Sequence, residues 1–207
     1  MARVQKRSPE VFLNVPYDKK FERLFLAFIS GISAFGLVPR ATLEITTSVR
    51  RLDRILDLIR RCEYSMHDLS RVEIDRGAPR TPRFNMPFEL GLSVAFEKAS
   101  KSRTRGWFVC ESQSYRLAKS LSDLNGTDPF IHDGTIEGVF RELGNMFRRP
   151  GRQPSVQQMR TIYRKLRINL PAVLRQAGSG TPYAARVFRD LSVIASAAAV
   201  EVMLTRR

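Results

Sequence analysis

Two acidic residues, Asp68 and Glu89, lie at junctions between apolar segments of the chain, where a carboxylate could take part in chemistry. Asp68 ends the short segment 64–68, and Glu89 precedes an apolar helix that continues to Phe96. With Asn85 as the N-cap, Glu89 is expected in the first helical turn, where the helix dipole favours an ionised carboxylate. Such a group can cap backbone amides, or it can attack or stabilise an anomeric carbon with oxocarbenium character. The spacing alone fits capping and catalysis equally well.

Short apolar segments with strand composition alternate along the chain with segments of helical periodicity. Strands are expected at 10–15, 37–41, 64–69, 105–111 and 128–132, and helices at 21–36, 50–62, 85–98 and 136–148, with a short helix or turn at 117–124. This alternation is typical of an α/β fold, a flavodoxin- or Rossmann-like parallel sheet of about five strands flanked by helices. Pro39 confines the second strand to an edge or an end of the sheet.

Ligands bind outside the carboxyl ends of the strands in a parallel sheet of this kind. Three segments of the chain fall at that edge if the strands are parallel, namely 14–18, 67–70 and 85–89. The two acidic residues therefore belong to segments that the fold should bring to one edge.

The composition divides the chain into three parts. These are a loose basic N-terminus at 1–9, the α/β domain at 10–149 and a basic C-terminal helical hairpin at 150–207. The hairpin helices are expected at 155–176 and 183–204, and Pro171 should kink or break the first. The second helix carries an apolar stripe, which either forms a homo-oligomer or packs back on its own domain. The stripe consists of Leu191, Ile194, Ala195, Ala198 and Val202.

The charge of the chain is strongly positive and uneven. The whole chain carries a formal charge of +15, and residues 151–207 hold ten basic and two acidic residues, a net charge of +8. A basic surface attracts nucleic acid, anionic membranes or phosphorylated ligands, but it can also be simply a solvated surface. Arg40, Arg50 and Arg51 lie near element ends, where they could hold phosphates. Nucleic-acid binding through the basic tail is thus an alternative function, although no nucleic-acid-reading motif accompanies it.

Several other classes of function are disfavoured. The longest apolar run, 191–204, is too short for a membrane span and is interrupted by Glu201, so we expect a cytoplasmic chain without a membrane partner. Cys62 and Cys110 are expected to be reduced core residues. Two histidines and two distant cysteines give no metal-site spacing, so no metal site is predicted. No glycine-rich phosphate loop is present.

The segment Asp68-Leu69-Ser70, followed by a loop and by Asn85-Met86-Pro87-Phe88-Glu89-Leu90-Gly91, resembles a recurrent pattern. The pattern is Asp-Leu-Ser/Thr, a loop, then Asn-x-x-Phe/Tyr-Glu-Leu-Gly, as in bacterial TIR-like nucleotide-binding proteins, and it is similar to nucleoside 2-deoxyribosyltransferases. The resemblance covers roughly residues 10–135. Met86 and Pro87 depart from the expected residues, and the loop is long and basic, with arginines that would serve phosphate groups or be solvated.

The resemblance implies an enzyme that cleaves or transfers the N-glycosidic bond of NAD, a nucleoside or a nucleotide. It could act in bacterial defence or signalling, with no further cofactor. Glu89 would be the nucleophile or oxocarbenium stabiliser and Asp68 a sugar-hydroxyl or acid–base partner. The other implied substrate-binding residues are Asn14, Pro16, Tyr17, Asp18, Ser70, Arg83 and Asn85. Among these Tyr17 would stack on the base, and Asn85 would shape the loop or contact the ribose. Because some members only bind or scaffold, a non-catalytic nucleotide-sensing module is the alternative.

Overall fold

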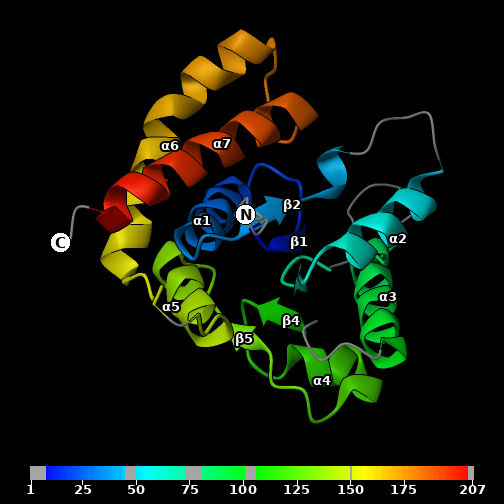
Figure 1. Ribbon diagram of the computed structural model, residues 1–207. Coiled ribbons are helices and arrows are strands. Elements are labelled where there is room, and N and C mark those ends of the chain that lie inside the picture. Colours follow the sequence, from blue (N-terminus) through cyan, green and yellow to red (C-terminus); the bar gives the residue numbers. More distant parts are fainter. Residues whose placement is uncertain (1–7, 45–49, 73–80, 101–105, 150, 205–207) are drawn as a thin grey trace, which may run out of the picture.

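A five-stranded sheet with helices on both faces forms the centre of the molecule (Figure 1). The computed structural model describes residues 8–44, 50–72, 81–100, 106–149 and 151–204. The strands are β1 (Glu10–Asn14), β2 (Val38–Arg40), β3 (Tyr64–Asp68), β4 (Gly106–Glu111) and β5 (Phe130–Ile131). The helices are α1 (Glu22–Ala34), α2 (Arg51–Arg61), α3 (Asn85–Ala99), α4 (Arg116–Ser120), α5 (Ile136–Met146), α6 (Val156–Ala177) and α7 (Ala185–Leu204), with short 3₁₀ helices at Thr42–Glu44 and Ser122–Leu124.

The strands are all parallel and have the order β2-β1-β3-β4-β5. This is the flavodoxin-like order, so the predicted fold class is confirmed. β2, which contains Pro39, is an edge strand as predicted. The chain reverses its direction across the sheet between β1 and β3, and the carboxyl ends of these two strands form the crevice where such folds bind ligands.

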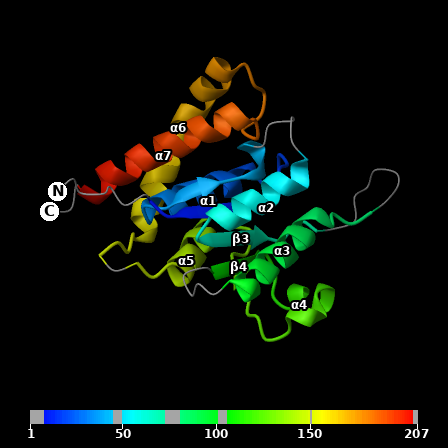
Figure 2. The same cartoon turned by 45° about the vertical axis from the view of Figure 1, so that its right-hand side comes forward.

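The two faces of the sheet are covered by different helices (Figure 2). Along β1 the side chains alternate: Val11 and Leu13 pack in the cluster with α1 and α5, whereas Phe12 packs with Ile55 and Ile59 of α2. α3 lies beside α2 and completes that second layer. A side chain at the end of a strand therefore faces either α1 and α5 or α2 and α3.

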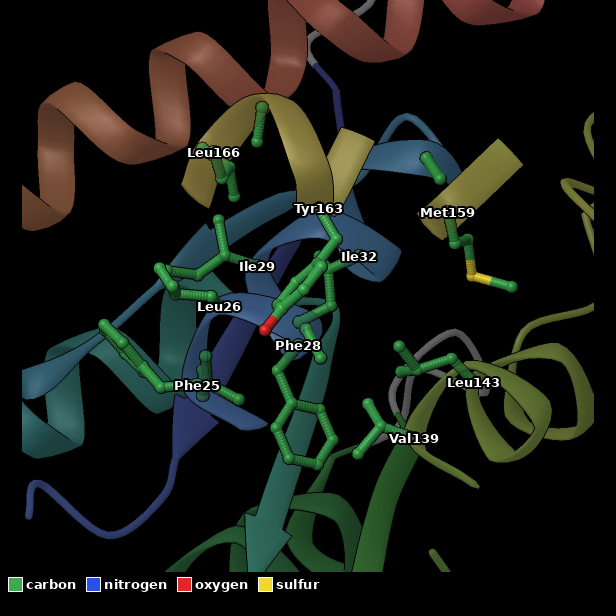
Figure 3. Close-up of a cluster of buried hydrophobic side chains, with 14 of the residues drawn as sticks. Phe25, Leu26, Phe28, Ile29, Ile32, Val139, Leu143, Met159, Tyr163 and Leu166 are labelled. Carbon is green, nitrogen blue, oxygen red and sulfur yellow. The ribbon is translucent and has the colours of Figure 1, made fainter. Parts of the chain in front are cut away.

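The C-terminal hairpin packs on α1 and shares one hydrophobic core with it (Figure 3). Met159, Tyr163 and Leu166 of α6 are buried in the same cluster as Ile29 and Ile32 of α1. Three residues of the predicted α7 stripe, Leu191, Ala195 and Ala198, are buried in this cluster, and Ile194 and Val202 pack partly buried against it. Of the two roles considered for the stripe, the structure therefore shows that it packs back on the chain's own domain.

The expectation that Pro171 breaks the first hairpin helix is wrong. Pro171 neither ends nor divides α6, which runs continuously from Val156 to Ala177. Proline removes one helical hydrogen bond, and Pro171 lies on the exposed side of α6, where water can satisfy the carbonyl that loses its partner.

Two further sequence features can be compared with the structure. Cys62 and Cys110 are buried and free, as predicted. No helix within the described ranges is long and apolar enough to cross a membrane.

Side chains of α5 and α6 pack against α1 at Gly31, and substitution of this residue tests the packing. A Cβ at Gly31 would lie 2.2 Å from Leu143 Cδ1 and 3.4 Å from Met159 Sδ, whereas a Cβ at Gly144 of α5 would have no atom within 4 Å. We expect Gly31→Ala to lower the free energy of unfolding by up to about 2 kcal/mol, because overpacking outweighs the gain in helix propensity. Gly144→Ala should raise it by about 0.5–1 kcal/mol. Urea titrations measure both, and a gain in both variants would contradict close packing at Gly31.

Candidate functional site

The crevice at the carboxyl ends of β1 and β3 is held together by Asn14. Asn14 and His67 are partners in the register of the two strands. Asn14 Nδ2 donates to His67 Nδ1 at 3.0 Å and to the carbonyl oxygen of Met86 at 3.1 Å. One amide group therefore joins both strands to the first turn of α3, three residues before Glu89.

His67 is a neutral, buried ring. Because Nδ2 of Asn14 can only donate, Nδ1 of His67 accepts and the ring proton lies on Nε2. Burial lowers the pKa of His67 to about 3, and the ring packs edge-on to Phe12, with centroids 5.9 Å apart. Nε2 is buried without a hydrogen-bond partner among the described residues. His67 thus positions Asn14 and carries no charge near neutral pH.

Glu89 presents a buried carboxyl group. Its side chain is only 3% exposed, and Oε2 is buried without a hydrogen-bond donor in the described part of the chain. Burial raises the pKa of Glu89 to about 7, while the positive charge of Arg51 acts in the opposite direction. A carboxyl group with this pKa exchanges its proton readily near neutral pH, as expected of a catalytic acid, base or nucleophile.

The start of α3 differs from its prediction. Phe84, not Asn85, is the N-cap, and no side chain caps the helix. Asn85 is the first helical residue; it is exposed and makes no side-chain hydrogen bond to the described residues. Glu89 is consequently the fifth residue of α3 and lies beyond the first turn, where the helix dipole is weak. The expectation that the dipole keeps Glu89 ionised is therefore wrong, because burial has the larger effect.

Tyr17 lies near Glu89 but within an aromatic cluster. Its hydroxyl group is 3.1 Å from Thr42 Oγ1, and its ring contacts Phe25 and Tyr183 with centroids 6.2 and 5.5 Å away. Burial raises the pKa of Tyr17 above its ordinary value, and the charge of Glu89 raises it further. The structure thus brings Tyr17 close to Glu89, with neighbouring rings against it; its stacking on a base stays a prediction.

Asp18 and Arg83, both predicted to bind substrate, form an ion pair with one another. Asp18 Oδ1 accepts hydrogen bonds from the amides of Lys20 and Phe21 before α1. Asp18 Oδ2 is 3.3 Å from Arg71 Nε and 3.4 Å from Arg83 Nη1. Asp18 therefore ties residues on both sides of the basic loop to the segment after β1. The preceding Pro16 is buried, and Arg76 and Arg80 of the loop lie outside the described residues.

Asp68 faces the opposite side of the sheet from Glu89. Its Oδ1 accepts from the amide and hydroxyl groups of Ser70, at 2.9 and 2.5 Å, and its Oδ2 is 2.9 Å from His132 Nε2. The amide of Gly134 donates to His132 Nδ1, so the ring proton lies on Nε2 and points to Asp68. His132 also packs edge-on to Phe28 of α1. Because neighbouring side chains of a strand alternate, His67 faces α3 while Asp68 faces α1.

This geometry separates the two predicted catalytic residues. Asp68 is fully buried, and both of its oxygens are occupied by Ser70 and His132. The structure brings Asn14, Tyr17 and Glu89 into one neighbourhood and leaves Asp68 with Ser70 behind β3. The role of Asp68 as a sugar or proton partner stays a prediction.

Sequence reasoning gave no role to Glu111, another buried carboxyl group. Glu111 ends β4 and is fully buried; burial raises its pKa to about 7, Arg116 lowers the pKa and Asp68 raises it. Its Oε1 is 3.5 Å from Arg116 Nε. The signal that could have found it is the one that identified Asp68, an acidic residue at the end of an apolar strand.

Other ligand chemistry is less well supported. Among the described residues, no group of three or more His, Cys, Asp and Glu side chains is placed to hold a metal ion.

Comparison of the chain with protein-family models, with curated proteins and with solved structures gives no match. The geometry around Glu89 is therefore the main indication of a function.

The buried Glu89 should reduce stability above neutral pH, and Glu89→Gln tests this. Between pH 4.5 and about 7 the unfolded chain releases this proton whereas the folded chain retains it, so stability falls as pH rises through this range. Above pH 7 the deficit is constant, at up to about 3 kcal/mol. We expect Glu89→Gln to unfold at higher urea concentration than the wild type at pH 8 and at nearly the same concentration at pH 5. An equal difference at both pH values would contradict the raised pKa.

The contact between Asp68 and His132 should be strongly coupled. In a double-mutant cycle of Asp68→Asn and His132→Gln we expect an interaction free energy of about 1–3 kcal/mol, because both groups are buried and directly bonded. The matched control is the exposed pair of Asp133 and Arg141, 3.0 Å apart, with an expected coupling below about 0.5 kcal/mol. Urea unfolding measures both cycles. Equal coupling in the two would show that burial adds nothing to the Asp68 contact.

Proposed function

We propose that the protein cleaves or transfers the N-glycosidic bond of NAD or of a nucleotide, with Glu89 as the reacting carboxylate. The observation that carries the proposal is the buried carboxyl group of Glu89 beside the switch point of a flavodoxin-like sheet, with its Oε2 unpartnered among the described residues. Ligands of such folds bind at this crevice. The resemblance of residues 68–91 to TIR-like and deoxyribosyltransferase-like sequences supports the same chemistry.

The proposed reaction breaks the bond between C1′ of the ribose and the nitrogen of the base. The bonding electrons leave with the base, and positive charge develops on C1′ and the ring oxygen of the sugar. Ionised Glu89 either attacks C1′ or stabilises this charge without a covalent bond. Water or a second acceptor then bonds to C1′ and releases its proton, giving hydrolysis or transfer; on the covalent route this step breaks the bond between C1′ and Glu89 and returns its electrons to the carboxylate.

The pKa of Glu89 favours a substrate that carries positive charge at the glycosidic nitrogen. A carboxyl group with a pKa of about 7 is only partly ionised at neutral pH. A cationic ring bound beside it would lower that pKa and favour the reactive form. The nicotinamide of NAD is such a ring, and it leaves as a neutral base without needing an acid. Asp68 is hydrogen-bonded to His132 and is not free to protonate a leaving base. NAD is therefore our first choice of substrate, because its cleavage does not require such a proton donor.

Arg51 supports a phosphorylated substrate over a plain nucleoside. It is an exposed residue in the first turn of α2, and its positive charge acts on both Glu89 and Tyr17. Guanidinium groups bind phosphates through paired hydrogen bonds, and helix N-termini attract anions. Arg51 would hold a phosphate of the nucleotide while the glycosidic bond lies at Glu89.

A nucleotide-sensing module without turnover is the second candidate. The observation that favours it is the internal engagement of Asp68, which leaves Glu89 without a second free carboxyl group among the predicted site residues. Calorimetry with NAD and nucleotides distinguishes the candidates, since binding without release of the base supports sensing alone.

Release of the base from NAD, nucleotides and nucleosides tests the enzymatic proposal. We expect Glu89→Gln to lower the turnover of the preferred substrate at least about a thousandfold, because the neutral amide cannot attack or stabilise the oxocarbenium ion. The rate for the wild type should rise with pH and level off above about pH 7, as Glu89 ionises.

Glu10→Gln is the matched control. Glu10 is also a buried carboxyl group, 8% exposed, but it begins β1 at the opposite edge of the sheet. This variant should keep the activity of the wild type. Equal activity in Glu89→Gln and the wild type would remove Glu89 from the mechanism, and absence of nucleotide binding would remove both candidate functions.

A further inference from the structure

A groove between α5 and α6 is lined by cations and lies away from Glu89. It has a volume of about 450 Å³ and is lined by Ile136 and Glu137 of α5 and by Arg160, Tyr163, Arg164, Arg167 and Ile168 of α6. α5 and α6 lie on the face of the sheet that α1 covers, whereas Glu89 belongs to α3 on the other face (Figure 2). The groove is therefore separate from the proposed glycosidic site.

Two arginines of the groove have no acidic partner among the described residues. Arg160, Arg164 and Arg167 follow one another at spacings of four and three residues, which places them on one side of α6. Arg160 Nη2 is 3.0 Å from Glu137 Oε1. In the described part of the chain, no carboxylate lies within ion-pair distance of Arg164 or Arg167. Both are exposed, so the groove holds positive charge that its own residues do not balance.

A second hollow lined by arginines differs from the groove in its ion pairs. The hollow beside α2 also contains arginines and carboxylates. There, however, Arg40 pairs with Glu44 at 3.3 Å and Arg60 with Asp57 at 3.9 Å. Arg40 and Arg60 therefore differ from Arg164 and Arg167, because each has a carboxylate within ion-pair distance.

The remaining lining of the groove suits the apolar part of a ligand. Ile168 is 77% exposed, although it is a large apolar side chain, and it lies one turn after Arg164. Tyr163, which also lines the groove, is buried and anchors α6 on the core (Figure 3). Guanidinium groups at the rim and an apolar surface between them match a molecule with both phosphate and a hydrophobic or aromatic portion.

We propose that this groove is a second binding site, for a phosphorylated small molecule of nucleotide size. Its volume falls within the roughly 300–1,000 Å³ of small-ligand pockets. Arg164 and Arg167 bind the phosphate groups, and Ile168 covers the apolar part of the ligand. A concave site favours a small ligand over a nucleic-acid strand, which is bound by phosphate contacts spread along its backbone.

The experiment measures binding of fluorescent ATP, with pyrophosphate and a 20-base-pair DNA duplex as competitors, by the full chain carrying Glu89→Gln. This background prevents turnover at the other site and leaves the groove intact. We expect saturable binding of one ATP at the groove, weakened at least about tenfold by the double substitution Arg164→Gln and Arg167→Gln. The control is Arg175→Gln with Arg189→Gln, which removes the same charge from exposed arginines outside the groove and should change the affinity less than about twofold.

Three outcomes would overturn the proposal. Equal weakening by both double variants would show that net charge, not the groove, attracts the ligand. Binding of the duplex without binding of ATP would make the surface a nucleic-acid site. The third outcome is ATP binding that the groove variant leaves unchanged and that Arg51→Gln abolishes. It would assign the ligand to the proposed glycosidic site, beside Arg51 and Glu89.

Discussion

The amide of Asn14 is the interaction on which the geometry of the site depends. With two hydrogen bonds it fixes the end of β1 against the end of β3 through His67, and it fixes both against α3 through the carbonyl of Met86. Each bond contributes only about 0.5–1.5 kcal/mol. Together, however, they set the position from which α3 carries Glu89 into the crevice. Because His67 is neutral, this arrangement holds without placing a positive charge beside Glu89.

The burial of Glu89 lowers the free energy of unfolding. Its Oε2 is buried without a donor from the part of the chain that the structure describes, and this burial opposes folding whenever the group is ionised. Asp68 shows the opposite solution, since Ser70 and His132 satisfy both of its oxygens. The carboxyl group of Asp68 therefore stabilises the folded chain, whereas that of Glu89 lowers its stability when it is ionised. Such a loss of stability is expected of a residue that is needed for activity.

The sequence was sufficient for the fold but not for the site. Apolar periodicity and strand composition predicted the order of the elements, and Pro39 predicted that β2 is an edge strand. The same reasoning placed Asp68 and Glu89 at one edge of the sheet. It could not show that they face opposite layers, because that depends on which residue of β3 points to α3. Nor could it predict the contact of Asp68 with His132, which lies 64 residues away in the chain.

The contact of Tyr183 with the segment after β1 determines how the C-terminal hairpin can be studied. The hydroxyl group of Tyr183 donates to the carbonyl oxygen of Asp18 at 2.6 Å, and its ring lies against Tyr17 and Phe25. A chain shortened before α6 would therefore expose the core of α1 and release the segment that borders Glu89. Any loss of nucleotide chemistry after such a deletion would report on this support as well as on the basic surface. Single substitutions on the outer face of α6 can distinguish the two, whereas removal of the hairpin cannot.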